Sequence, residues 1–234
     1  METLSELLAR ERRSERVACR VEAESRSYDY DGFLTIAWQA GNYLRHLAVR
    51  EGVSVGIADD PIPEAFLAAL GTGLLGGAAW FDPPARADLR AFVGPTEDVE
   101  SRDPSPGFRR VAYGGETDDP AIARLEEGLW SENPTMPPER PPPETPILTD
   151  GRRRFSQREL LAAAGRLTGD GDIQHGTDVV LRAPLSDPSA VVGVLATLRA
   201  EATLVFPASG EPGGDVAIGS GPEPAAVSLE GIAL

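Results

Sequence analysis

Apolar residues in the stretch 54–83 predict a strand, a helix and a second strand. Val55 and Ile57 start a β-type run that ends at a turn rich in acid and proline. Pro63 then opens a helix, because proline is favoured in the first helical turn. Apolar residues recur at spacings of three and four and form one helix face: Phe66, Leu67, Leu70, Leu74 and Leu75. With a strand at 78–81, the unit implies a parallel pair joined by a right-handed crossover.

The same pattern occurs again at 178–207. With one constant offset, Val55 corresponds to Val179 and Leu74 corresponds to Leu198. A β-hairpin and a helix are predicted upstream of each copy. We therefore expect an α/β fold with two similar hairpin–helix–βαβ lobes, each with a parallel sheet. A repeat of this size favours two lobes over a solenoid, whose periods are shorter.

Composition suggests where the lobes end. Prolines and acids dominate the segment 96–145, so we expect a linker there, with one short helix at 120–130 and a polyproline end. The first α/β lobe is then expected at 1–95. The second lobe and a C-terminal tail are expected at 146–234. The two lobes are thus predicted to be joined by a Pro-rich linker.

Several helix starts carry a capping signal. Thr3 with Glu6 and Ser156 with Glu159 have capping-box spacing, and Asp29 can cap a long helix over 30–50. The other expected elements are a hairpin turn at 150–151, a short helix at 86–90, and strands at 91–94 and 215–218. The last segment, 225–234, shows no clear periodicity.

Charge narrows the classes of partner. The chain has 37 acidic and 22 basic residues, a formal charge of −15, and all the basic residues are arginine. Such an acidic surface favours the cytoplasm of a salt-accumulating organism such as a haloarchaeon, and it disfavours nucleic acid and anionic membranes as partners. Cys19 alone can form neither an internal disulfide nor a cysteine-based metal cluster. We expect a cytoplasmic protein, because no apolar run could span a bilayer and the N-terminus reads as a polar helix.

The segment Gly71–Gly76 matches the pattern G-x-G-x-x-G. A dinucleotide site needs these glycines in the turn directly after a strand, at the positive end of a helix. Here they fall in the C-terminal half of the predicted helix, where the partial charge is negative. The corresponding positions of the second copy hold other residues. We interpret the glycines as helix-packing positions.

Other polar residues give two interpretations each. His46 and His175 lack a second ligand at metal spacing, so exposed structural histidines are favoured and no metal site is predicted. Asp59 and Asp60 follow a parallel strand, where sites often form, but a turn that starts a helix is favoured. The arginines at 152–154 could hold a phosphate or carboxylate, although a solvated hairpin is favoured. Neither a G-x-S-x-G motif nor a Walker A motif is present, and no catalytic residue is predicted.

Two stretches resemble a known family. The sequence Tyr28-Asp29-Tyr30 leads into a long helix, and the segment 53–84 follows with Ala78, Pro83 and Pro84 at familiar spacing. This stretch resembles the N-terminal part of the AMP-forming acyl-CoA synthetases, the adenylate-forming ligases. The second copy, with Glu-Ala-Thr-Leu-Val at 201–205, is similar to the start of the family's next lobe. The resemblance implies two similar α/β lobes and an acid–thiol ligase activity that uses ATP.

The chain departs from that family at the phosphate-handling parts. Where the family has a Ser/Thr/Gly-rich loop ending in Pro-Lys-Gly, this chain has 147–152, in which Thr149, Gly151 and Arg152 are the candidate nucleotide contacts. The family's catalytic lysine has no counterpart, because the chain contains no lysine. Both parts stabilise charge that develops during adenylation. The later adenine-binding motifs and the small C-terminal domain would lie beyond Leu234.

These features predict a truncated, non-catalytic acyl-CoA synthetase-like protein. It would act as a binding or regulatory module that associates with a ligase subunit or with itself and needs no cofactor. The alternative is a fragment of a split AMP-forming acyl-CoA or acetate ligase that another chain completes, in which case ATP or AMP would bind. A decayed remnant without a selected function is the third interpretation.

Overall fold

The chain forms two compact units, each with its own β-sheet. The computed structural model describes residues 1–208, 210–227, 232 and 234. Unit 1 comprises Met1–Leu34, Pro61–Pro63 and Phe155–Leu234, and unit 2 comprises Thr35–Asp60 and Glu64–Arg154. The chain therefore divides at places other than the domain ends at 95 and 145 that the composition suggested.

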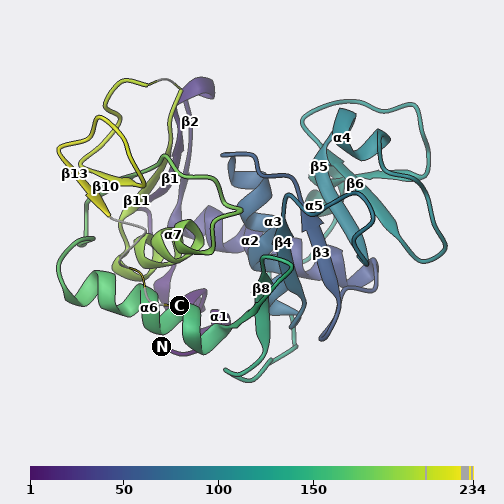
Figure 1. The fold of residues 1–234 in the computed structure, drawn as a ribbon, viewed down its shortest axis with the longest axis horizontal. Coiled ribbons are helices and arrows are strands. Elements are labelled where there is room, and N and C mark those ends of the chain that lie inside the picture. Colours follow the sequence, from purple (N-terminus) through teal and green to yellow (C-terminus); the bar gives the residue numbers. More distant parts are fainter. Residues whose placement is uncertain (209, 228–231, 233) are drawn as a thin grey trace. The chain divides into compact units, whose positions relative to one another are not determined.

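Unit 1 is built on a six-stranded sheet with the order β13-β12-β10-β11-β1-β2 (Figure 1). Neighbouring strands of this sheet run parallel except β1 and β2, which form an antiparallel hairpin. The central strands are buried because both faces of a parallel sheet are usually covered. The strands are β1 (Val17–Val21), β2 (Arg26–Asp29), β10 (Asp178–Leu181), β11 (Thr203–Phe206), β12 (Val216–Ile218) and β13 (Ala225–Val227).

Two long helices accompany this sheet. α7 (Pro188–Ala200) joins β10 to β11 and packs on β10, β11 and β12, while α6 (Gln157–Gly169) lies beside α7. The predicted capping box forms at α6, because Ser156 accepts the Glu159 N–H and the Glu159 carboxylate accepts the Ser156 N–H. The N-terminal helix α1 (Leu4–Leu7) is a single turn that starts after Thr3, and a 3₁₀ turn at Arg10–Arg12 follows it.

A guanidinium group caps the end of α7. Arg12 Nη2 donates to the carbonyl oxygens of Leu198 at 2.7 Å and Arg199 at 3.1 Å, in the last helical turn, where carbonyls lack the usual intrahelical partner. The Leu198 carbonyl also accepts the Glu201 N–H at 3.1 Å. Close by, the buried Tyr30 hydroxyl donates to the Ala202 carbonyl at 2.7 Å. Burial raises the pKa of Tyr30, so this hydroxyl stays a donor.

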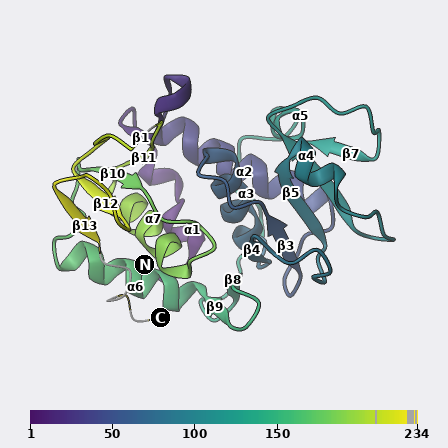
Figure 2. The ribbon, with the colours of Figure 1, turned by 45° about the horizontal axis from the view of Figure 1, so that its top comes forward.

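Unit 2 is built on a seven-stranded sheet with the order β7-β6-β5-β3-β4-β8-β9 (Figure 2). The pairs from β7 to β8 run parallel. The boundary between the units falls within β9. The strands are β3 (Ser54–Ile57), β4 (Ala78–Phe81), β5 (Ala91–Pro95), β6 (Arg109–Tyr113), β7 (Ile122–Arg124), β8 (Pro146–Thr149) and β9 (Arg154–Ser156).

The glycine-rich helix of unit 2 packs tightly on its neighbour. α3 (Pro63–Leu74) joins β3 to β4, and α2 (Tyr30–His46) precedes β3. A Cβ atom at Gly71 would lie 2.7 Å from the backbone of Ala40 and Gly41 in α2, closer than side chains tolerate. The packing interpretation is therefore confirmed for Gly71, whereas Gly76 lies beyond the end of α3 with a φ of +76°.

The predicted α/β class with largely parallel sheets is confirmed, but the hairpins pair differently from expectation. The hairpin β1–β2 precedes the first βαβ segment in sequence, yet β1 pairs with β11 of the second segment. Similarly, β8 precedes the second segment and pairs with β4 of the first. Alternating apolar residues predict a strand but do not identify the strand with which it pairs. The repeat pattern therefore could not show that β1 and β8 each pair with a strand of the other segment.

The segment 96–145 is folded rather than a plain linker. It contributes α4 (Thr96–Glu100), β6, β7 and α5 (Leu125–Trp130), and buried side chains of this region share a cluster with Ala58 and Phe92. Its end, 131–145, is the longest part without helix or strand, and even there Asn42 Nδ2 donates to the Thr135 carbonyl at 2.8 Å. The short helix predicted at 86–90 does not form.

Candidate functional site

The hairpin turn between β8 and β9 holds the candidate nucleotide contacts. Thr149 Oγ1 accepts the Gly151 N–H at 3.1 Å and donates to the Arg153 carbonyl at 2.8 Å. Asp150 Oδ1 accepts the N–H groups of Arg152 at 2.8 Å and Arg153 at 2.7 Å. Hydrogen bonds from Arg153 and then Arg152 hold the pKa of Asp150 below its usual value, although partial burial opposes them.

The backbone conformation of Gly151 and its contact with Trp80 also fix the turn. Gly151 has a φ of +84°, a conformation that favours glycine, and a Cβ atom there would clash with the Trp80 ring. The structure thus brings Thr149 and Gly151 into one turn, while Arg152 contributes its backbone N–H to the Asp150 carboxylate. Successive N–H groups of this turn point at protein acceptors.

The acidic pair after β3 has a protein partner. Tyr113 Oη, at the end of β6, donates to Asp60 Oδ2 at 2.6 Å. Burial and then this hydrogen bond raise the pKa of Tyr113, so its hydroxyl remains a donor. The bond ties the carboxyl ends of two strands together, which supports the structural interpretation of Asp60.

The two histidines lie in different units and are both exposed. His46 Nε2 lies 3.4 Å from a Glu132 carboxylate oxygen, and His175 lies beside the Arg16 guanidinium. Within the described ranges, no group of three or more His, Cys, Asp or Glu side chains has an arrangement that could hold a metal ion. None of the helices in that same part of the chain has the length and apolar character needed to cross a membrane.

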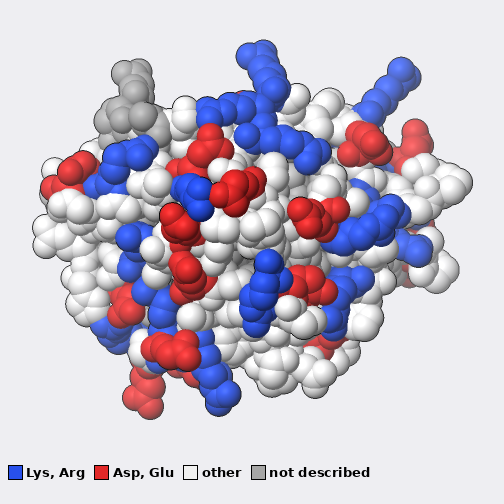
Figure 3. Space-filling view, turned by 90° about the horizontal axis from the view of Figure 1, so that it is seen from below, with Lys and Arg blue, Asp and Glu red and all other residues white. Residues whose placement is uncertain are grey.

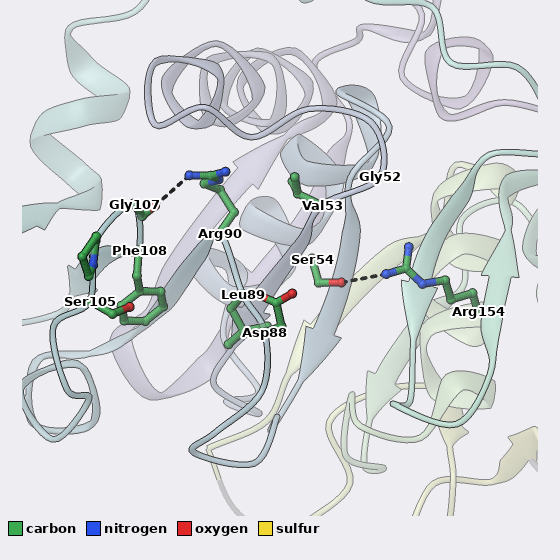
Figure 4. Close-up of a pocket in the computed structure, with 11 residues that line it drawn as sticks. Gly52, Val53, Ser54, Asp88, Leu89, Arg90, Ser105, Gly107, Phe108 and Arg154 are labelled. Carbon is green, nitrogen blue, oxygen red and sulfur yellow. Dashed lines mark hydrogen bonds between the residues drawn. The ribbon is translucent and has the colours of Figure 1, made fainter.

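A polar cavity lies at the amino ends of the unit 2 strands (Figure 4). Its volume is about 300 Å³, and its walls come from the starts of β3, β5 and β6 and from β9. Arg154 Nη2 donates to Ser54 Oγ at 3.2 Å, and Arg90 Nη1 donates to the Gly107 carbonyl at 2.8 Å. Asp88 also lines it.

Sequence reasoning missed this cavity. Arg90 fell in a segment predicted as helix, and Arg154 fell in an arginine run interpreted as solvated. The two residues are far apart in sequence, and only the strand order brings them to one cavity. The run of three arginines was the single available signal.

The fold is that of the N-terminal part of acyl-CoA synthetase-like ligases. The N-terminal domain of FACL13 from Mycobacterium tuberculosis matches with a TM-score of 0.71 at 14% identity, over 88% of this chain and 57% of that one. ATP-bound MatB from Rhodopseudomonas palustris matches with a TM-score of 0.74 at 14% identity, over 92% and 48%. The anthranilate CoA ligase AuaEII in complex with anthranoyl-AMP matches with a TM-score of 0.72 at 16% identity, over 88% and 45%.

This chain spans about half the length of those solved proteins. No protein-family profile matches it, and no curated protein matches it at a significant level. At this level of identity the likeness establishes the fold.

Proposed function

We propose that this chain, with the fold of an adenylate-forming ligase N-terminal part, is a non-catalytic binding or regulatory module. The observation that carries the proposal is the hairpin turn 149–153. Its N–H groups at Gly151, Arg152 and Arg153 already donate to Thr149 and Asp150.

Phosphate loops work because several backbone N–H groups point at the ligand and no side chain competes for them. In this turn the competing acceptor is a carboxylate, which also repels the negative phosphates of a nucleotide. The lowered pKa of Asp150 keeps that carboxylate ionised at neutral pH. The absence of lysine removes a further source of positive charge. Together these features disfavour binding and activation of magnesium–ATP at this turn.

The first prediction is that the chain does not catalyse pyrophosphate exchange into ATP. The assay supplies magnesium–ATP, labelled pyrophosphate and either acetate or a longer fatty acid, because adenylate formation from any of these acids exchanges the label. We expect a rate equal to that of the enzyme-free control, while a competent acyl-CoA synthetase assayed in parallel gives a clear signal.

Acid-dependent exchange by the chain alone would overturn the proposal. Exchange that appears only after a second protein is added would instead support the alternative, a split ligase completed by another chain. The coverage of about half of the solved ligases is the observation that favours this alternative. Association with a ligase subunit or with itself is part of the proposal, and light scattering of the purified chain tests the second of these.

A further inference from the structure

We propose that the cavity at the amino ends of β3, β5 and β6 binds a small hydroxylated anion, with a phosphate or carboxylate as its charged group. Arg90 and Arg154 would hold the anion, and Asp88 would accept a hydrogen bond from a ligand hydroxyl. The inference goes beyond the proposed function, because it holds whether or not the chain forms adenylates.

Neither arginine of the cavity has a carboxylate partner within the described part of the chain. Among the described residues, Arg90 and Arg154 donate only to uncharged oxygens, those of Gly107 and Ser54. Many other arginines form ion pairs with acidic side chains, as Arg110 does with Asp119 at 2.7 Å. In a chain with 37 acids, two guanidinium groups that share a cavity and lack an acid partner leave positive charge available to a ligand.

The Arg90 guanidinium has an unused donor. Its Nε–H is buried and has no hydrogen-bond acceptor within the described part of the chain. A buried donor without an acceptor destabilises a protein, and an oxygen atom of a bound ligand would complete the hydrogen bonding of this donor. A phosphate or carboxylate supplies two oxygens in the geometry that guanidinium groups prefer.

The other walls restrict the ligand further. Ser54 and Ser105 can donate hydroxyl hydrogen bonds, and Phe108 gives an apolar wall (Figure 4). The Asp88 carboxylate would repel a bare anion, but it would accept a hydrogen bond from a ligand hydroxyl. A volume of about 300 Å³ is at the lower end for ligand cavities, which suits a molecule of a few carbon atoms.

The second prediction is that the full chain binds a small hydroxylated anion. Calorimetry at low, constant ionic strength measures this binding, since salt screens charges. The probes are glycerol 3-phosphate and malate, which separate the two sources of anion. We expect saturable one-to-one binding of at least one of them. Arg154→Gln should weaken it about tenfold, because a charge-assisted hydrogen bond is lost. Arg152→Gln is the matched control, since it removes the same charge from the same hairpin outside the cavity.

Asp88→Asn gives a readout specific to the ligand hydroxyl. If glycerol 3-phosphate binds, this variant should bind inorganic phosphate more tightly and prefer glycerol 3-phosphate less. The corresponding comparison for malate uses succinate, which lacks the hydroxyl. The inference is overturned if neither probe saturates up to about 10 mM. It is also overturned if Arg152→Gln weakens binding as much as Arg154→Gln, because the effect would then be one of general charge.

Discussion

At the scale of single residues, Glu223 belongs to the most buried ion pair among the residues that the structure describes. Its side chain has no exposed surface, and Arg182 Nη2 lies 2.6 Å from its Oε1. The Gly213 N–H also donates to this carboxylate. The contact joins Arg182, directly after β10, to the segment before β13, and it adds a side-chain link to the backbone pairing of β10, β12 and β13.

The third prediction concerns this pair. Glu223→Ala should lower the free energy of unfolding by about 3–5 kcal/mol, because the change removes the carboxylate that faces the largely buried Arg182 guanidinium. Urea unfolding followed by circular dichroism measures the loss. Arg158→Ala is the control, since its ion pair with Glu2 is exposed and should contribute less than about 1 kcal/mol. Equal losses in the two variants would contradict the prediction.

The same pair should make stability depend on pH. Burial alone would raise the pKa of Glu223, but hydrogen bonds from Arg182 and from backbone N–H groups outweigh it and hold the pKa below the usual 4.5. A lowered folded-state pKa contributes stability above the unfolded-state pKa, and that contribution is lost as the pH falls through the folded-state value. The fourth prediction is therefore that the difference between the wild type and Glu223→Gln shrinks below pH 4.5. A constant difference from neutral to acidic pH would contradict it.

At the scale of elements, helices were predicted better than strands and sites. The three- and four-residue periodicity placed α3 and α7, and the capping box placed the start of α6. The short strands β6 and β7 were missed, because prolines and acids around them resemble a linker in composition. The polar cavity was missed for another reason, since its arginines lie on elements whose neighbours in the sheet cannot be inferred from periodicity.

The fifth prediction concerns the contact between α2 and α3. Gly71→Ala should destabilise the protein by about 1–3 kcal/mol, because the new methyl group meets the backbone of α2 and forces the helices apart. Gly165→Ala in α6 is the matched control. Its Cβ would make only ordinary contacts with Arg199, so the better helix propensity of alanine should stabilise it by about 0.5–1 kcal/mol. Thermal unfolding shows whether each variant is less or more stable than the wild type. Unchanged stability of Gly71→Ala would contradict close packing of α2 and α3.

At the scale of the whole molecule, acidic and basic side chains are interspersed on the face seen in Figure 3. Although the chain carries a net charge of −15, its acidic side chains do not form a uniform acidic surface on that face. A salt-rich cytoplasm stays a proposal drawn from composition. The class of the fold was predictable because two βαβ segments carry clear patterns, but the division into units was not, since each unit combines segments distant in sequence.

The pairing of β1 with β11 has a consequence for synthesis of the chain. Cys19 lies opposite Leu204, so one edge of the N-terminal hairpin has no partner until β11 has left the ribosome. An unpaired strand edge can template aggregation, and contacts distant in sequence form slowly. One edge of β1 thus stays unprotected while the chain between β1 and β11 is synthesised, and in the cell a chaperone that shields nascent strands would matter most for this hairpin.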